Sequence, residues 1–488
     1  MTMTKQPNIL FILADDLGMW ALGAAGNHEV LTPNMDKLAE DGVWCDNFYC
    51  TSPVCSPARA SILSGKIPSQ HGVHDWIRSG NMNKEKLEPA FKDHPLFKEE
   101  HKAIDYLEGQ TTYPQLLAEA GYVCALSGKW HLGNSLKPHQ GFTHWYTIAR
   151  GGCHYMQPDI VENGNVDFKE EYVTNLITEN AIHCINEFSQ GDRPFYLSVH
   201  YTAPHSPWDR SDHPEKYISM YDNCLFHSVP ELPIHPNQIP TAPYGEGERR
   251  KELLRGYYAS ITAMDDGIGQ LMAELEEKDM RKNTLIIVMS DNGMNMGHHG
   301  VWGKGNGTFP LNMFDTSIKV PAIFSYPGVI PSGTICEELI SQYDIFPTLL
   351  EYAGIHYPNE ERLPGKSFAG LLRGEADCFR DDVVIFDEYG PVRMIRTKEW
   401  KYVHRYPYGP HELYHLKDDP DEEINKIDDT DCEVIVDNLR NRLGEWFSTY
   451  VEPNKDGIYA PVTGYGQVNL AVPGLREGSS FAYKVDKE

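Results

Sequence analysis

Asn8-Ile9-Leu10-Phe11-Ile12-Leu13-Ala14-Asp15-Asp16 combines an apolar run with two aspartates that follow it at once. A short run of this kind, rich in isoleucine and bounded by polar residues, is typical of a strand buried on both faces of a parallel sheet. Asp15 and Asp16 are therefore expected at the carboxyl end of that strand, where ligands bind in open α/β sheets. An aspartate pair alone also fits a turn or a helix cap.

A second buried run, residues 285–289, ends in the same way, at Ser290-Asp291-Asn292-Gly293. Between the two runs, strand patterns at 122–126 and 195–199 alternate with helical patterns, and the alternation continues to about residue 375. It predicts a doubly wound α/β domain over residues 1–375, with a large mixed or parallel sheet flanked by helices.

The pattern changes after residue 375. We expect a smaller C-terminal α+β subdomain over 376–488, with an antiparallel sheet, one helix and an irregular tail. The expected strands are 382–387, 391–396 and 400–405, and the expected helix is 433–449. The tail from residue 451 is expected to wrap the body or to be partly disordered.

The pentapeptide Cys55-Ser56-Pro57-Ala58-Arg59 is typical of the start of a helix. Ser56 is a suitable cap, Pro57 suits the first turn, and Gly65 is a natural stop. A thiol at this place would face free backbone N–H groups and the positive end of the helix dipole. The pattern therefore suits an anion held beside a nucleophile, although alone it also fits a buried structural cysteine.

Cys55-x-Pro57-x-Arg59 resembles the maturation signature of the sulfatase family, in the alkaline-phosphatase-like superfamily, whose cysteine is oxidised to formylglycine. Ala58 stands where many members have Ser. The run from Asn8 to Asp16 resembles the family's first strand with its paired aspartates. Further matches follow in the family's order: Gly128-Lys129-Trp130-His131-Leu132-Gly133, Pro204-His205-Ser206-Pro207, Ser290-Asp291-Asn292-Gly293, Gly303-Lys304-Gly305, and Glu412-Leu413-Tyr414-His415-Leu416 with Asp419-Pro420.

The resemblance implies a bound divalent cation, Ca²⁺ rather than Mg²⁺. Its expected ligands are Asp15, Asp16, Asp291, Asn292 and residue 55. Carboxylate and amide oxygens are hard ligands, which suit either of these ions.

The resemblance also implies the catalytic roles. As formylglycine hydrate, residue 55 carries two hydroxyls, of which one attacks sulfur and the other later expels sulfate. The remaining expected roles are nucleophile orientation by Arg59, sulfate binding by Lys129 and Lys304, proton acceptance by His131 and protonation of the leaving oxygen by His205. Asp291 is a plausible base for the attacking hydroxyl.

Loops and the C-terminal part are expected to recognise the sugar. Residues 66–111 are predicted to be irregular, and 206–247 to form a long lid or insertion. The candidate substrate residues, weighed against ordinary surface or strand-pairing roles, are His74, Trp76, Arg78, Asp387, Glu388, Arg393, His404, Arg405 and His411.

The composition of the chain limits the kinds of molecule that it can bind. The net charge of −27 argues against nucleic acid and weighs mildly against long polyanionic substrates. The sequence contains no run of 18 apolar residues, so we expect no membrane-spanning helix. Ten cysteines without regular spacing suggest free thiols. The start shows no signal peptide, so we expect a cytoplasmic protein, or a periplasmic or secreted one if a signal was removed.

The leading hypothesis is a formylglycine-dependent, Ca²⁺-binding sulfatase that acts on a sulfated mono- or oligosaccharide and needs a formylglycine-generating maturation enzyme. One alternative is a phosphonate or phosphate ester hydrolase of the same superfamily. Another is a non-catalytic sugar-binding protein whose Cys55 is never oxidised.

Overall fold

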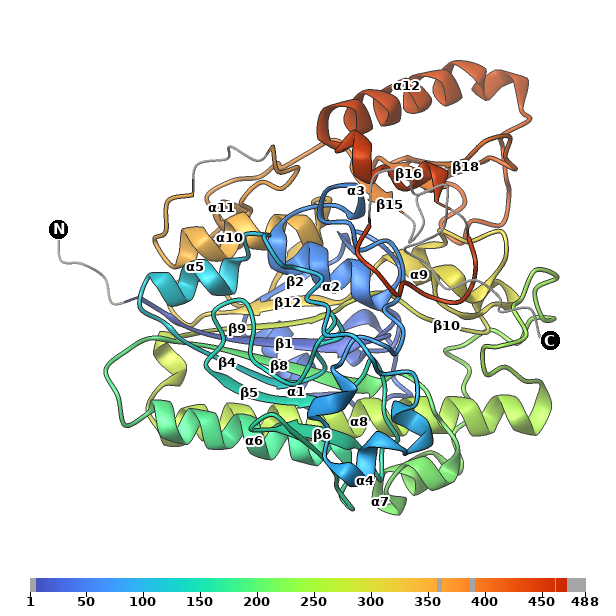
Figure 1. Cartoon of the computed structure of the whole chain (residues 1–488). Coiled ribbons are helices and arrows are strands. Elements are labelled where there is room, and N and C mark those ends of the chain that lie inside the picture. The colour runs from blue at the N-terminus through green and yellow to red at the C-terminus, as the bar shows by residue number, and fades with distance from the viewer. Residues whose placement is uncertain (1–5, 358–361, 387–390, 461, 472–488) are drawn as a thin grey trace.

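A ten-stranded mixed sheet forms the centre of the computed structural model, which describes residues 6–357, 362–386, 391–460 and 462–471 (Figure 1). Its five central strands, β9-β1-β8-β4-β5, run parallel to one another, and strands of mixed direction extend both edges. In spatial order the strands are β13 (Thr334–Cys336), β2 (Val43–Cys45), β12 (Ala322–Ser325), β9 (Thr284–Ser290), β1 (Asn8–Asp15), β8 (Phe195–Pro204), β4 (Val123–Gly128), β5 (His144–Ile148), β6 (Asp159–Glu162) and β7 (Asn165–Phe168).

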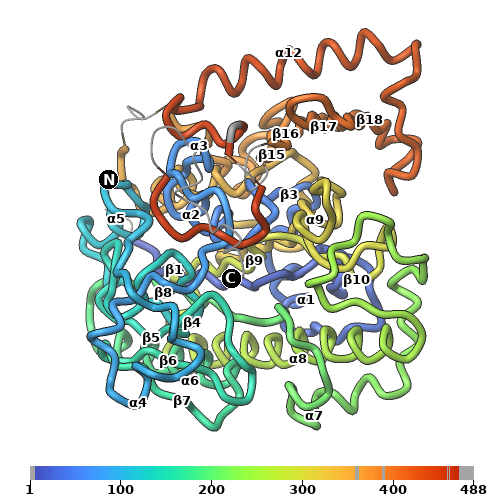
Figure 2. The backbone as a smooth tube through the Cα atoms, turned by 45° about the vertical axis from the view of Figure 1, so that its right-hand side comes forward, coloured from blue at the N-terminus to red at the C-terminus, as the bar shows by residue number. Residues whose placement is uncertain are grey.

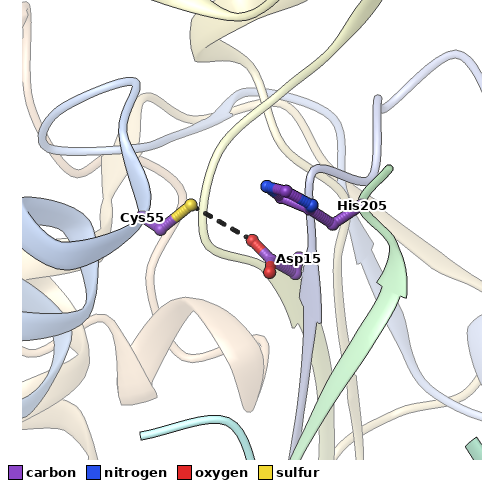
Figure 3. Close-up of side chains that lie close together, drawn as sticks. All are labelled: Asp15, Cys55 and His205. Carbon is purple, nitrogen blue, oxygen red and sulfur yellow. Dashed lines mark hydrogen bonds between the residues drawn. The ribbon is translucent and has the colours of Figure 1, made fainter. Parts of the chain in front are cut away.

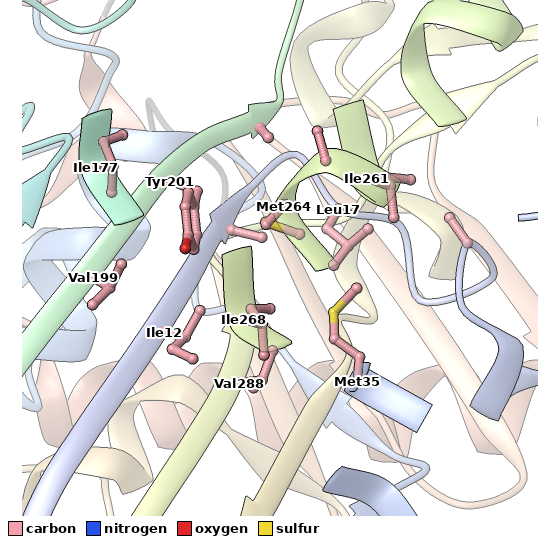
Figure 4. Packing of buried hydrophobic residues seen from close by; sticks show 14 of the residues in the cluster. Ile12, Leu17, Met35, Ile177, Val199, Tyr201, Ile261, Met264, Ile268 and Val288 are labelled. Atoms are coloured by element: carbon pink, nitrogen blue, oxygen red, sulfur yellow. The ribbon is translucent and has the colours of Figure 1, made fainter. Parts of the chain in front are cut away.

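Strand β1 lies in the middle of the sheet because both of its faces are apolar. It pairs with β8 on one side and with β9 on the other, and every residue from Asn8 to Asp15 is buried. Ile12 contributes to the core on one face, together with Val199 of β8 and Val288 of β9 (Figure 4). Phe11, one residue earlier, contributes to the core on the opposite face. The prediction of a buried central strand is confirmed.

Helices cover both faces of the sheet (Figure 1). The core that contains Ile12 is closed by α1 (Pro33–Glu40), α6 (Val173–Phe188) and α8 (Gly247–Glu277). The core that contains Phe11 is closed by α2 (Cys55–Ser64), α5 (Tyr113–Glu119) and α10 (Ile345–Tyr352). The predicted α/β class is therefore confirmed.

A four-stranded antiparallel sheet follows, in the order β15-β16-β17-β18, and α12 (Glu433–Tyr450) packs on it. The strands are β15 (Val383–Phe386), β16 (Val392–Arg396), β17 (Trp400–Arg405) and β18 (Glu412–His415). Figure 1 shows this unit beyond α2 and α10, on the side away from α6 and α8. The small sheet with one helix is confirmed, while a domain boundary at residue 375 stays a prediction.

Some local features were not predicted. Residues 43–49 form two strands, β2 and β3 (Phe48–Tyr49), because Asp46 and Asn47 turn the chain between two sheets. The sequence did not predict strands β5, β6 and β7, which extend one edge of the large sheet, or strand β18. Residues 66–111 are mostly irregular, as expected, but include the short helices α3 (Pro68–His71) and α4 (Pro89–Lys92).

The chain after α12 returns to the large unit and packs against the loop at 69–78, beside α2 and α3 (Figure 2). Gln467 is fully buried there: its Oε1 accepts the His74 N–H at 2.8 Å, and its Nε2 donates to the Gly72 carbonyl at 2.9 Å. The described part of the tail therefore wraps the body. Among the described residues, no helix is both long and apolar enough to cross a membrane.

Candidate active site

The predicted metal and catalytic residues meet at the carboxyl edge of the parallel strands. Topology explains this convergence, because each residue ends or follows a parallel strand, lies in the first two turns of α2, or lies in a loop beside them. The residues and the elements they follow or begin are Asp15 and Asp16 (β1), Cys55 and Arg59 (α2), Lys129 and His131 (β4), His205 (β8), Asp291 and Asn292 (β9), and Lys304 (β11, Trp302–Gly303).

Three buried carboxylates form the base of the site. Oxygens of Asp15, Asp16 and Asp291 lie within 4.8 Å of one another. The Asp16 N–H donates to Asp291 Oδ1 at 3.2 Å, with Asp16 at a φ of 66°, a conformation that aspartate tolerates better than most residues. Asn292 Nδ2 donates to Asp16 Oδ1 at 2.7 Å, whereas Asn292 Oδ1 is buried and accepts no hydrogen bond from the described residues.

Cys55 begins α2 and points at this base. Its Sγ lies 3.2 Å from Asp15 Oδ1 and 2.8 Å from Lys304 Nζ. Figure 3 shows the sulfur directed at the Asp15 carboxylate, with the His205 ring beside the same group. The prediction that Ser56 caps the helix was wrong, because its Oγ instead accepts the Ile77 N–H at 3.1 Å. The prediction that Gly65 ends the helix is confirmed, and Gly65 has a φ of 70°.

Three cations offset the three carboxylates. Lys129 Nζ lies 2.5 Å from Asp15 Oδ2, and Lys304 Nζ lies 2.5 Å from Asp16 Oδ1. Arg59 is 1% exposed, and its Nε and Nη2 lie 3.0 and 2.9 Å from Asp291 Oδ2. These pairs satisfy charges whose burial would otherwise be strongly unfavourable.

The ionisation of the carboxylates follows from these neighbours. Burial opposes the charge on Asp15, but Lys129, His205, Arg59 and Lys304 hold its pKa well below the ordinary value. Burial, together with the charge on Asp15, raises the pKa of Asp291 to about 7. Of these two carboxyl groups, Asp15 therefore holds its negative charge more strongly than Asp291.

The two histidines present one ring nitrogen each to the site. His131 Nε2 lies 3.0 Å from the Ile77 carbonyl, which can only accept, so the proton sits on Nε2 and leaves Nδ1 with a lone pair. Burial and the Lys129 charge hold the pKa of His131 well below its ordinary value, and Nδ1 has no partner among the described residues. His205 Nδ1 bonds the Ser206 carbonyl at 2.8 Å, and its Nε2 lies 3.7 Å from Asp16 Oδ2.

A cavity of about 410 Å³ opens above Cys55. Asp16, His131, His205 and Lys304 line its floor together with Cys55. The predicted substrate residues Trp76 and Arg78 lie in its wall. So do residues 239 and 241–243, which belong to the predicted lid or insertion.

Among the described residues, the other predicted substrate residues do not line this cavity. His74 is fully buried against Phe386, and Asp387 and Glu388 lie outside the described residues. The remaining ones make contacts with other protein groups. Arg393 pairs with Asp456 and lies 3.6 Å from the Phe447 ring centre, His404 stacks on His411 at 4.3 Å, and Arg405 pairs with Glu412 and donates to the Leu311 carbonyl.

Sequence reasoning missed several cavity residues, notably Glu100, Arg150 and Asn306. The one usable signal lay at Arg150-Gly151-Gly152, just after β5. Two consecutive glycines beside the carboxyl end of a strand indicate a close approach of the backbone to a neighbouring group.

A family model described as Sulfatase matches residues 7–355. The chain belongs to the sulfatase family. A second model, described as N-sulphoglucosamine sulphohydrolase, C-terminal, matches residues 297–448 of this sulfatase. The protein is accordingly a sulfuric ester hydrolase.

Named relatives cover nearly the whole sulfatase. The N-acetylglucosamine-6-O-sulfatase of Bacteroides thetaiotaomicron is 26% identical over 87% of this chain and 83% of its own length. The ulvan-active sulfatase of Formosa agariphila is 30% identical over 90% of this chain and 81% of its own. A solved structure, described as in complex with its substrate D-glucosamine-2-N,6-O-disulfate, shares the fold at a TM-score of 0.73 and 24% identity, covering 93% of this chain and 99% of that one.

The sulfatase is predicted to keep an unmodified Cys55 unreactive. Burial and the Asp15 charge raise the pKa of its thiol to about 12, and the thiolate is the species that alkylates. In protein that still carries the thiol, we expect iodoacetamide at pH 8 to label the exposed Cys378 well before Cys55, and the Cys55 rate to rise as the pH approaches 12. Peptide mass spectrometry reads both sites, and urea-unfolded protein is the control. Equal labelling of both cysteines in the folded protein would contradict the prediction.

Proposed function

We propose that this sulfatase hydrolyses a sulfate monoester on a mono- or oligosaccharide, with residue 55 acting as formylglycine and Ca²⁺ bound at the carboxylate base. A separate maturation enzyme would oxidise Cys55. The observation that carries the proposal is the position of Cys55 Sγ between Lys304 Nζ and Asp15 Oδ1, on the floor of the cavity. The sugar substrate class is supported by the names of the two relatives.

The carboxylate base fits a hard divalent cation. Asp15, Asp16 and Asp291 would hold it through oxygens that already lie within 4.8 Å of one another. Asn292 would add Oδ1, a buried acceptor without a hydrogen bond from the described residues. When bound, the cation would supply positive charge that stabilises oxygens of the nucleophile and the sulfate.

Formylglycine would supply the nucleophile as its hydrate, and attack on sulfur followed by collapse to the aldehyde divides the reaction into two steps. The ammonium groups of Lys129 and Lys304 would bind the sulfate oxygens and offset the charge that develops on them. Arg59 acts as a positioning residue, because its guanidinium holds Asp291, one of the groups around residue 55.

Proton transfer would fall to the histidines. His131 has an unpartnered lone pair on Nδ1 and its lowered pKa keeps the ring neutral, so it would be free to accept the hydroxyl proton that accompanies sulfate release. His205 presents Nε2 to the cavity and suits protonation of the leaving sugar oxygen.

Sulfate release from a panel of sulfated sugars tests the proposal. Matured wild-type protein is expected to release sulfate, and Cys55→Ala to lose at least about 10³-fold in kcat, because removing the nucleophile leaves only binding and electrostatic effects. The exposed Cys378→Ala variant is the matched control and should keep wild-type activity. Turnover of phosphate or phosphonate esters in preference to matched sulfates, or sugar binding without any turnover, would overturn the proposal.

Thermal melting tests the cation. After chelation and dialysis, CaCl₂ at a hundredfold excess over its Kd should stabilise the folded protein by about 2.7 kcal/mol, and MgCl₂ should need higher concentrations. Asp291→Asn should remove most of this shift, because it takes one charge from the buried base. Asp437→Asn, on an exposed position of α12, should keep it. Equal CaCl₂ shifts in the wild type and Asp291→Asn would rule out this cation site.

A further inference from the structure

Arg150 is, with Arg78, one of two arginines among the described residues that line the cavity without belonging to any sulfatase motif described above. It follows β5 at the carboxyl edge of the sheet and lines the cavity above Cys55. The next residue, Gly151, passes so close to His131 that a Cβ there would lie 2.1 Å from Nε2. Arg150 is thus one residue away from direct contact with a proposed catalytic group.

Two contacts orient the Arg150 side chain. Its Nε donates to Asp159 Oδ2 at 2.7 Å, and the Asp159 side chain is 2% exposed. The guanidinium carbon lies 5.6 Å from the centre of the Phe97 ring. A buried carboxylate on one edge and an aromatic ring beside the plane leave this long side chain little freedom, so its geometry is preorganised.

The opposite edge of the guanidinium has no partner. Neither terminal nitrogen of Arg150 makes a hydrogen bond to a described residue, the side chain is 19% exposed, and the residue lines the cavity. An oriented fork of two N–H donors is suited to bind the two oxygens of a carboxylate or a sulfate. Gly152 leaves room nearby, since a Cβ there would meet no atom within 4 Å.

The other charges of the cavity wall are already engaged. Arg78 pairs with both oxygens of Glu99 at 3.1 Å. Glu100 is 2% exposed and lies close enough to Arg150 to interact with it, but its Oε2 accepts the Met82 N–H at 2.9 Å. Burial raises the pKa of Glu100, although the Arg150 charge opposes that shift. Asp159 offsets part of the Arg150 charge through Nε, while the two terminal nitrogens, which no described residue engages, remain available to donate to a ligand.

We propose that Arg150 is a specificity-determining residue that binds a second anionic group of the sugar, a carboxylate or a further sulfate, while the sulfate to be cleaved sits over residue 55. The inference rests on the proposed function and deepens it, because it defines the substrate class as acidic sugars that carry at least two negative charges. It does not require a long polyanion.

The test compares matched substrates that differ only in the second anionic group. Disulfated and uronate-bearing sugars are set beside their monosulfated neutral counterparts, and kcat/KM is measured for each with the matured enzyme. Arg150→Met is expected to lower the preference for the doubly charged sugar by about 10- to 100-fold, as expected for the loss of hydrogen bonds to a charged group. Arg150→Lys should retain part of the preference, because it keeps the charge without the fork.

Two controls separate recognition from structure. Arg210→Met removes an exposed arginine that pairs with Glu215 and Asp222 outside the cavity, and it should leave the preference unchanged. If Arg150 only ties β5 to β6 through Asp159, its variants will lower kcat/KM equally for both members of each substrate pair. That result, or a wild type that prefers the neutral sugar, overturns the inference.

A binding measurement keeps the inference apart from the proposed function. Calorimetry with Cys55→Ala should detect tighter binding of the disulfated sugar than of the monosulfated one, and Cys55→Ala/Arg150→Met should lose that difference. Binding of this kind without wild-type turnover would sink the proposed function but support the role of Arg150. Turnover with no difference in binding would support the proposed function but overturn the role of Arg150. Comparison of the uronate-bearing and disulfated sugars shows which anion Arg150 prefers.

Discussion

The burial of three carboxylates beside three cationic side chains is the constraint on which this sulfatase depends. Asp15, Asp16 and Asp291 could not lie together at the edge of the sheet without Arg59, Lys129 and Lys304, because unpaired buried charges would destabilise the fold by several kcal/mol each. These pairs draw α2, β1, β4 and β9 to one point. The same charges that let the site fold are those that a sulfate ester and a divalent cation would meet there, so stability and chemistry rest on one cluster.

The cluster also supports the proposal that Cys55 is oxidised before it acts. Burial and the neighbouring Asp15 charge raise the pKa of its thiol to about 12, so the thiol remains protonated at neutral pH. A thiol is, in addition, a poor ligand for a hard cation. An oxygen nucleophile at the same position would suit the carboxylates, the lysines and a cation alike. The proposal of formylglycine follows from this mismatch as well as from the family.

Much of the fold and the aspartates of the base could be predicted from local sequence pattern, whereas Arg59, Lys129 and Lys304 were predicted there by the resemblance to the sulfatase family. The apolar run of β1 ends in Asp15 and that of β9 precedes Asp291, so parallel pairing alone brings the two carboxylates together. The expected sugar contacts at His74 and Arg393 did not reach the cavity, since their burial comes from long-range partners that no local pattern reveals. Arg150 was missed because its proposed role depends on its position in the cavity wall, which no local pattern gives. Only the two glycines that follow it indicated a close approach of the backbone to another group.

The central claim is that the cluster serves an oxidised residue 55, and one measurement tests it most directly. Peptide mass spectrometry across residues 50–66, on catalytically active protein from its native host, should find the thiol sulfur replaced by an aldehyde oxygen or its hydrate. The modified fraction should rise in proportion to the specific sulfatase activity of each preparation. An intact Cys55 thiol throughout a preparation that turns over sulfate esters at full rate would contradict the account.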